Sequence, residues 1–123
     1  MSITNTHSWT VASDNGASPL TGTQTETGAT LIDTNQSYDI GTSQAIAIAF
    51  SKTTLKSLFL LSTKNATLVF TLTTGTVTIN LVAGAPYVWD VSPGYFANPF
   101  GFDVTSAALT NTVATVLKIR VLY

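Results

Sequence analysis

The segment from Ala66 to Leu81, ATLVFTLTTGTVTINL, constrains the fold most, because two runs of alternating apolar and threonine residues meet at Thr74-Gly75. Successive side chains of a β-strand point to opposite faces, so each run predicts a strand with one apolar face. With a two-residue loop at Thr74-Gly75, Phe70 would lie opposite Ile79 and every apolar pair would share that face. Gly75 would supply the positive φ of such a turn. Because an isolated hairpin is marginal in water, the pattern predicts a second apolar layer packed over it.

Three other segments are predicted to form strands of the same protein. Gln44–Phe50 (QAIAIAF) alternates large apolar residues with alanines. Ser57–Ser62 (SLFLLS) is apolar on both faces, which is typical of a central strand covered on both sides. Ala114–Tyr123 (ATVLKIRVLY) alternates apolar residues with Lys118 and Arg120, charges that discourage pairing at a sheet edge.

The whole chain is predicted to be all-β. Tyr87–Val91 adds a strand that presents Tyr87, Trp89 and Val91 on one side, and shorter fragments bring the number to about eight, with turn residues between them and no convincing helix. This indicates an antiparallel β-sandwich, jelly-roll-like, over residues 29–123. Residues 1–28 carry few large apolar groups and are expected to form a polar N-terminal arm or edge strands of the same single domain.

Charge is scarce, and its scarcity limits the possible partners. Only 9% of the residues are charged, against about 25% in ordinary domains, and 23 threonines stand in their place. This is either a plain composition bias or the mark of a surface that is covered in an assembly. Five scattered lysines and arginines make nucleic-acid binding unfavourable. No apolar run reaches membrane-spanning length, so no membrane partner is expected.

Candidate catalytic residues are few. The chain has no cysteine, and His7 is its sole histidine. Asp90 and Asp103 flank an aromatic loop and would have to converge in a cleft to support a hydrolase; we expect them to make strand-end hydrogen bonds instead. We therefore predict no enzymatic activity, no cofactor and no metal site.

The stretch Gly84–Asp103 (GAPYVWDVSPGYFANPFGFD) is the richest in aromatic residues. Its rings could cap one end of the sandwich, anchor a contact between subunits, or offer a stacking platform to a sugar. Between the last two we rank the protein contact first, because few carboxylates and amides surround the rings. The candidate interface residues are Tyr87, Trp89, Tyr95, Phe96 and Phe100.

Four segments between residues 55 and 123 carry a resemblance: LKSLFLLSTKNATL, INLVAGAPYVWD, NPFGFDVTSAALTN and LKIRVLY. In this order they resemble small proteins encoded among the virion genes of tailed phages and prophages. The resemblance implies a β-sandwich virion protein, such as a decoration, cement or head-fibre-base component, and it offers no catalytic residue to carry over.

From the residues and the resemblance together we expect a non-enzymatic structural protein of a phage particle. It would be made in the bacterial host cytoplasm, bind the major capsid or tail protein in the virion, and associate with its own copies. The alternative is a carbohydrate- or receptor-binding β-sandwich module.

Overall fold

The computed structural model describes residues 2–12, 16, 18, 20–92 and 96–123, and of residues 7, 9 and 11 it describes the backbone only. In this part of the chain there is no helix, and hence none that could cross a membrane. The ten strands are β1 (Ile3–Val11), β2 (Leu20–Gly28), β3 (Leu31–Tyr38), β4 (Gly41–Ile46), β5 (Ser57–Ser62), β6 (Ala66–Leu72), β7 (Thr76–Leu81), β8 (Tyr87–Asp90), β9 (Val104–Asn111) and β10 (Thr115–Leu122).

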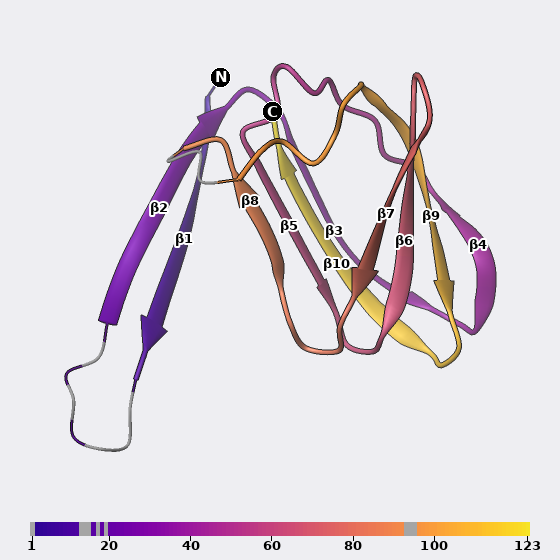
Figure 1. Ribbon diagram of the computed structural model, residues 1–123, viewed down its shortest axis with the longest axis horizontal. Coiled ribbons are helices and arrows are strands. Elements are labelled where there is room, and N and C mark those ends of the chain that lie inside the picture. Colours follow the sequence, from indigo (N-terminus) through magenta and orange to yellow (C-terminus); the bar gives the residue numbers. More distant parts are fainter. Residues whose placement is uncertain (1, 13–15, 17, 19, 93–95) are drawn as a thin grey trace.

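Eight of the strands form a sandwich of two antiparallel sheets (Figure 1). Sheet I has the order β3-β10-β5-β8, and sheet II has the order β4-β9-β6-β7. If the strands from β3 to β10 are lettered B to I, the sheets read B-I-D-G and C-H-E-F, which is the strand order of a jelly roll. The predicted fold class is confirmed, with ten strands in place of about eight.

The core lies between the inner faces of the two sheets and follows the alternation seen in the sequence. Leu58 and Leu60 of sheet I and Leu68 and Phe70 of sheet II have no exposed surface. Thr71 of β6 and Thr76 and Thr78 of β7 alternate with the inward residues of their strands and are exposed on the outer face of sheet II. Ile119 of β10 is buried in the same cluster, as the closing segment predicted.

The β6–β7 hairpin has the predicted inward face, but its turn is shifted. Phe70 pairs with Val77, and Thr71 pairs with Thr76, so the turn centres between Thr73 and Thr74 and the predicted register is wrong by two residues. A shift of two preserves the faces of a strand, because side chains alternate with a period of two. Gly75 follows the turn with a φ of +84°, a conformation that glycine adopts readily.

Four other features of the strands go beyond or correct the sequence predictions. β4 begins at Gly41 and ends at Ile46, although the alternation of buried isoleucines and exposed alanines continues to Phe50. β3 runs through the polar stretch 33–37, which has no apolar alternation of its own, because β10 pairs with it along its whole length. β10 itself is central rather than an edge strand. Val91 lies beyond the end of β8 and is 42% exposed.

A network of buried polar groups joins β4, β9 and β10 at one corner. The Oδ1 atom of Asn111 accepts hydrogen bonds from the Gly41 N–H (3.1 Å) and from Gln44 Nε2 (2.7 Å). Its Nδ2 atom donates to the Val113 carbonyl (2.8 Å) and to Thr115 Oγ1 (3.2 Å). Both Oδ1 and Nδ2 of Asn111 therefore have hydrogen-bond partners, so the burial of this polar side chain leaves no hydrogen bond unmade.

β1 and β2 form a sheet of their own, the N-terminal hairpin, which stands to one side of the sandwich in Figure 1. Its outward face carries pairs of hydroxyl groups, among them Thr4 with Thr27 (3.1 Å between the Oγ1 atoms) and Thr6 with Thr25 (3.4 Å). Residues 1–28, expected to be an arm or edge strands, thus lie outside the two large sheets where they are described.

We predict that Phe70→Ala lowers the free energy of unfolding by about 3–5 kcal/mol, because it leaves a cavity at a site with no exposed surface. Thr71→Ala, which truncates the next and exposed side chain, should cost about 0.5 kcal/mol or less. Chemical denaturation measures both values. Similar small losses for the two variants would contradict the inward assignment of Phe70.

Candidate functional site

The predicted aromatic stretch divides between the core and the surface. Phe100 is 2% exposed, and its ring makes edge contacts with Phe50 (5.3 Å between centroids) and Phe70 (4.9 Å). Asn98 holds the loop that delivers this ring, since its Oδ1 accepts from the Phe100 N–H (2.9 Å) and its Nδ2 donates to the Lys52 carbonyl (3.1 Å). Phe100 therefore caps the core and is not available to a partner.

Trp89 and Tyr87 also turn toward the interior. Trp89 is 7% exposed on the inner face of β8, and Tyr87 is partly buried against the core cluster. Burial raises the pKa of the Tyr87 phenol above its ordinary value. Neither ring offers the open face that a sugar platform would need.

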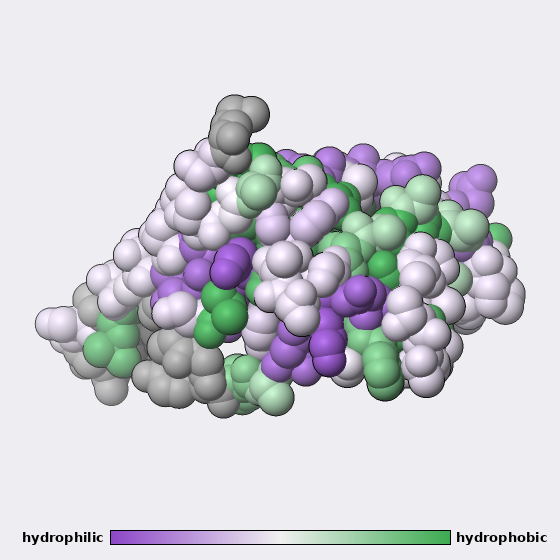
Figure 2. Space-filling view, turned by 90° about the horizontal axis from the view of Figure 1, so that it is seen from above, coloured by the Kyte–Doolittle hydropathy of each residue, from purple (hydrophilic) through white to green (hydrophobic). Residues whose placement is uncertain are grey.

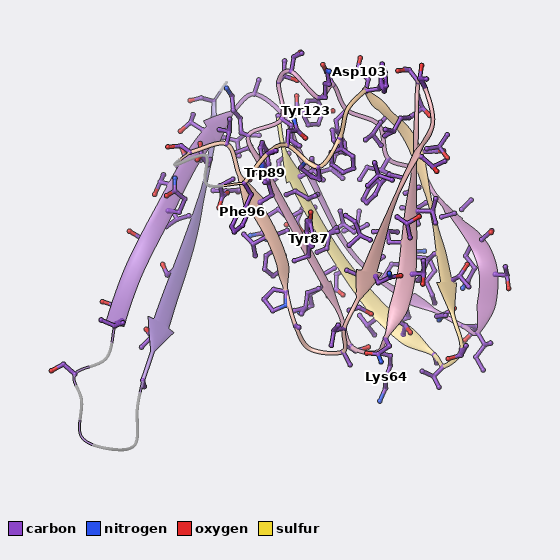
Figure 3. All side chains as sticks on the ribbon, in the orientation of Figure 1. Lys64, Tyr87, Trp89, Phe96, Asp103 and Tyr123 are labelled. Atoms are coloured by element: carbon purple, nitrogen blue, oxygen red, sulfur yellow. The ribbon has the colours of Figure 1, made fainter. Side chains whose placement is uncertain are left out.

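Phe96 is the described candidate that faces solvent, with 77% of its surface exposed. Trp89 Nε1 donates a hydrogen bond to the Phe96 carbonyl (3.1 Å), so a buried indole fixes the backbone that presents an exposed ring. Figure 3 places the two residues beside each other at the hairpin side of the sandwich. Tyr95 lies outside the described residues.

The N-terminal hairpin is joined to the sandwich at one end. The Tyr123 carbonyl accepts hydrogen bonds from the Ala29 N–H (2.8 Å) and the Thr30 N–H (2.7 Å). At Gly28 a Cβ atom would lie 2.9 Å from both Leu122 Cγ and the Tyr123 carbonyl oxygen, so the close approach of β2 to β10 requires glycine.

A buried carboxyl group adds a second attachment. Glu26 is 7% exposed, and its Oε1 accepts from the Ser92 N–H (3.0 Å) and from Gln24 Nε2 (3.0 Å). This ties the hairpin to the start of the aromatic loop. Opposite Glu26 in the hairpin, Asn5 is 8% exposed, and among the described atoms its Nδ2 has no hydrogen-bond partner.

A groove of about 770 Å³ lies between the hairpin and the outer face of sheet I. Its lining comes from six strands, β1, β2, β3, β5, β8 and β10, with Phe59 and Val88 among the apolar residues and Asp33 and Arg120 among the charged ones. Sequence reasoning missed this groove, because its residues are scattered along the chain. Only the alternation of Lys118 and Arg120 on β10 marked that face as exposed.

The two candidate carboxylates, Asp90 and Asp103, lie in different surroundings. Asp103 Oδ1 accepts from the Lys52 N–H (2.9 Å) and from Ser51 Oγ (3.2 Å), which confirms the strand-end role predicted for it. Asp90 lines the groove at the end of β8. Within the residues that the structure describes, no three His, Asp or Glu side chains gather as they would around a metal ion.

The surface of the N-terminal hairpin carries little charge, since Glu26 is the one charged residue of β1 and β2 and it is buried. Seen from above in Figure 2, the hairpin is mostly pale, the colour of intermediate hydropathy, as expected for its threonines.

No protein-family model, curated protein sequence or solved structure matches the chain. The class of the protein thus rests on its strand order alone: it is a jelly-roll β-sandwich with an N-terminal hairpin.

We predict that Glu26→Ala increases the hydrogen-exchange rate of the Ser92 amide about tenfold, because it removes an acceptor whose hydrogen bond is worth about 1 kcal/mol or more. Glu26→Gln keeps a side-chain oxygen and should exchange more slowly than the alanine variant. Thr23→Ala, an exposed change on the same strand, is the control. Equal rates at Ser92 in all three variants would mean that Glu26 does not hold the loop.

Proposed function

We propose that the chain is a non-enzymatic structural protein of a phage particle, which binds the capsid or tail surface and associates with its own copies. The observation that carries the proposal is the N-terminal hairpin. Its two nine-residue strands pair only with each other among the described residues and are attached to the sandwich at one end. A two-stranded hairpin is marginal in water, so it gains stability by packing against another surface.

Exposed apolar groups lie near this hairpin and support a protein contact. Phe96 is 77% exposed, and Val88 (43%) and Val91 (42%) precede it in the same stretch of chain. Aromatic groups are enriched at the centres of protein interfaces, where their burial contributes most. At this loop a protein contact is favoured over a sugar platform, because Trp89 and Phe100 are buried in the core.

The low charge of the chain supports self-association. With a formal net charge of −1, copies repel one another weakly, so apolar contacts between them face little electrostatic opposition.

The kind of assembly is proposed from the fold and the resemblance. Jelly rolls occur in viral capsid proteins and in lectins, and one fold hosts many functions, so the fold alone does not choose between them. The resemblance of residues 55–123 to virion proteins of tailed phages favours a particle, with the major capsid or tail protein as partner and the virion as its location.

We predict that Phe96→Ala weakens self-association or attachment to the particle by about thirtyfold, the loss typical of truncating an interface anchor (about 2 kcal/mol). Sedimentation of the purified variant measures self-association. Val82→Ala, which shortens another exposed apolar side chain (60%) next to β7 of sheet II, is the matched control. Equal association constants for both variants and the wild type would remove Phe96 from the interface.

Mass spectrometry of particles purified from the source tests the proposal as a whole. We expect the protein in stoichiometric, multiple copies, as required of a component that covers a repeated surface. Its absence from every particle fraction, with the protein present in the infected or induced cells, would overturn the proposed function.

A further inference from the structure

We propose that the free edge of β7 is a docking site for a second copy of the chain, which pairs its own β7 there in the antiparallel sense about a two-fold axis. Sheet II would then continue across the two copies in the order β4-β9-β6-β7-β7-β6-β9-β4. The inference rests on the self-association in the proposed function and assigns to it a contact surface apart from Phe96.

β7 ends sheet II and lacks the features that keep the edges of sheets from pairing. In the part of the chain that the structure describes, β6 is its one neighbouring strand, and the two strands pair without a register shift. The segment TVTINL has no charge, no proline and no glycine, and its first four residues are β-branched, which favours an extended backbone. Natural edge strands usually carry an interruption, because a regular edge is a template for another strand.

The other three edge strands of the sandwich are less suited to pairing. β4 has a register shift between Gly41 and Gln44, and Ser43 between them has a φ of +50°. β8 has four residues and begins directly after Pro86. β3 carries a charge at Asp33 and a polar sequence of low β-propensity. A further strand would therefore extend β7 with the least distortion.

The hydrogen bonds around the β6–β7 turn determine which backbone groups of β7 are directed at its free edge. The Leu72 N–H donates to the Gly75 carbonyl (3.0 Å), so these two residues are bonded to each other across the hairpin. In an antiparallel pair such residues alternate with residues whose N–H and C=O groups point away from the partner strand. The residues of β7 whose backbone groups point to the free edge are then Thr76, Thr78 and Asn80.

These groups match their own copies across a two-fold axis at Thr78. Antiparallel pairing would place Thr78 opposite Thr78 and Thr76 opposite Asn80 of the second copy, so each outward N–H and C=O group meets a partner. The side chains match as well, because Val77 would lie opposite Ile79 on the apolar inner face. A register one residue away would put apolar side chains opposite polar ones. This self-complementarity favours a second copy over an unrelated strand.

The approach of two copies at this edge meets little electrostatic opposition, because β7 has no charged residue and the chain has a formal net charge of −1. Val77 is only partly buried against the core, so its contact with Ile79 of the second copy would remove further apolar surface from water. Val82 follows β7 and lies outside the paired segment.

The first test is amide hydrogen exchange of the full chain at increasing protein concentration, with sedimentation in parallel. In a monomer the Thr78 amide is open to water, whereas in the pair it is bonded to the second copy, so we expect its exchange to slow by about tenfold or more on association. The amide of Ile79, which is bonded to β6 at every concentration, is the internal control.

Three outcomes would overturn the proposal. If the chain associates and the Thr78 amide exchanges at an unchanged rate, the copies meet through another surface, and the self-association in the proposed function stands. If the chain stays monomeric at millimolar concentration, that self-association fails as well, while attachment to the particle is still decided by mass spectrometry. If Thr78 is protected only after another protein of the particle is added, the edge belongs to that protein.

Charge substitutions at Thr78 test the position of the axis. Thr78 is exposed, so lysine or glutamate should leave the fold intact. Because like charges would then lie directly opposite each other, we expect Thr78→Lys and Thr78→Glu each to associate about tenfold more weakly than the wild type. An equimolar mixture of the two variants should recover the association, since lysine would then face glutamate.

Thr42→Lys is the matched control, because it adds the same charge to an exposed threonine of β4, the other edge of sheet II. We expect it to associate as the wild type does. Equal weakening by Thr42→Lys and Thr78→Lys, or no recovery in the mixture of the two Thr78 variants, would overturn the proposed pairing.

Discussion

The contact between the two inner faces of the sandwich is the interaction on which the rest of the structure depends. With so few charges, the chain gains its stability mainly by removing apolar surface from water. Phe100, from the loop between β8 and β9, enters this contact against Phe50 and Phe70. The part of the loop around Phe100 is therefore anchored by the core, and the Trp89 indole holds the carbonyl of the exposed Phe96 through a hydrogen bond.

The local part of the fold could be predicted from the sequence, because the alternation of β6, β7 and β10 needs no knowledge of their partners. The turn between β6 and β7 could not, since two registers that differ by two residues place the same side chains inside. The observed register is the one in which the Leu72 N–H donates to the Gly75 carbonyl (3.0 Å), and the alternation of side chains does not specify that hydrogen bond. β3 could not be predicted either, because its polar sequence forms a strand only through its pairing with β10.

The candidate site was less predictable than the fold. Trp89, Phe96 and Phe100 are similar in kind and close in sequence, yet one alone is exposed, because Asn98 and the Trp89 hydrogen bond set the direction of the loop. The groove leaves no local signal beyond the alternation of Lys118 and Arg120 on β10. Its Asp33–Arg120 ion pair joins residues 87 positions apart, which only the topology brings together.

The central place of β10 and the attachment of the hairpin at Tyr123 have a consequence for synthesis on the ribosome. The N-terminal hairpin emerges before the sandwich, but the Tyr123 carbonyl that accepts the Ala29 and Thr30 amides is made only after the strands of the sandwich. β3 and β5 must likewise wait for β10 to come between them. During translation the hairpin therefore remains undocked, and the nascent chain can meet other molecules with this segment before its own sandwich has closed.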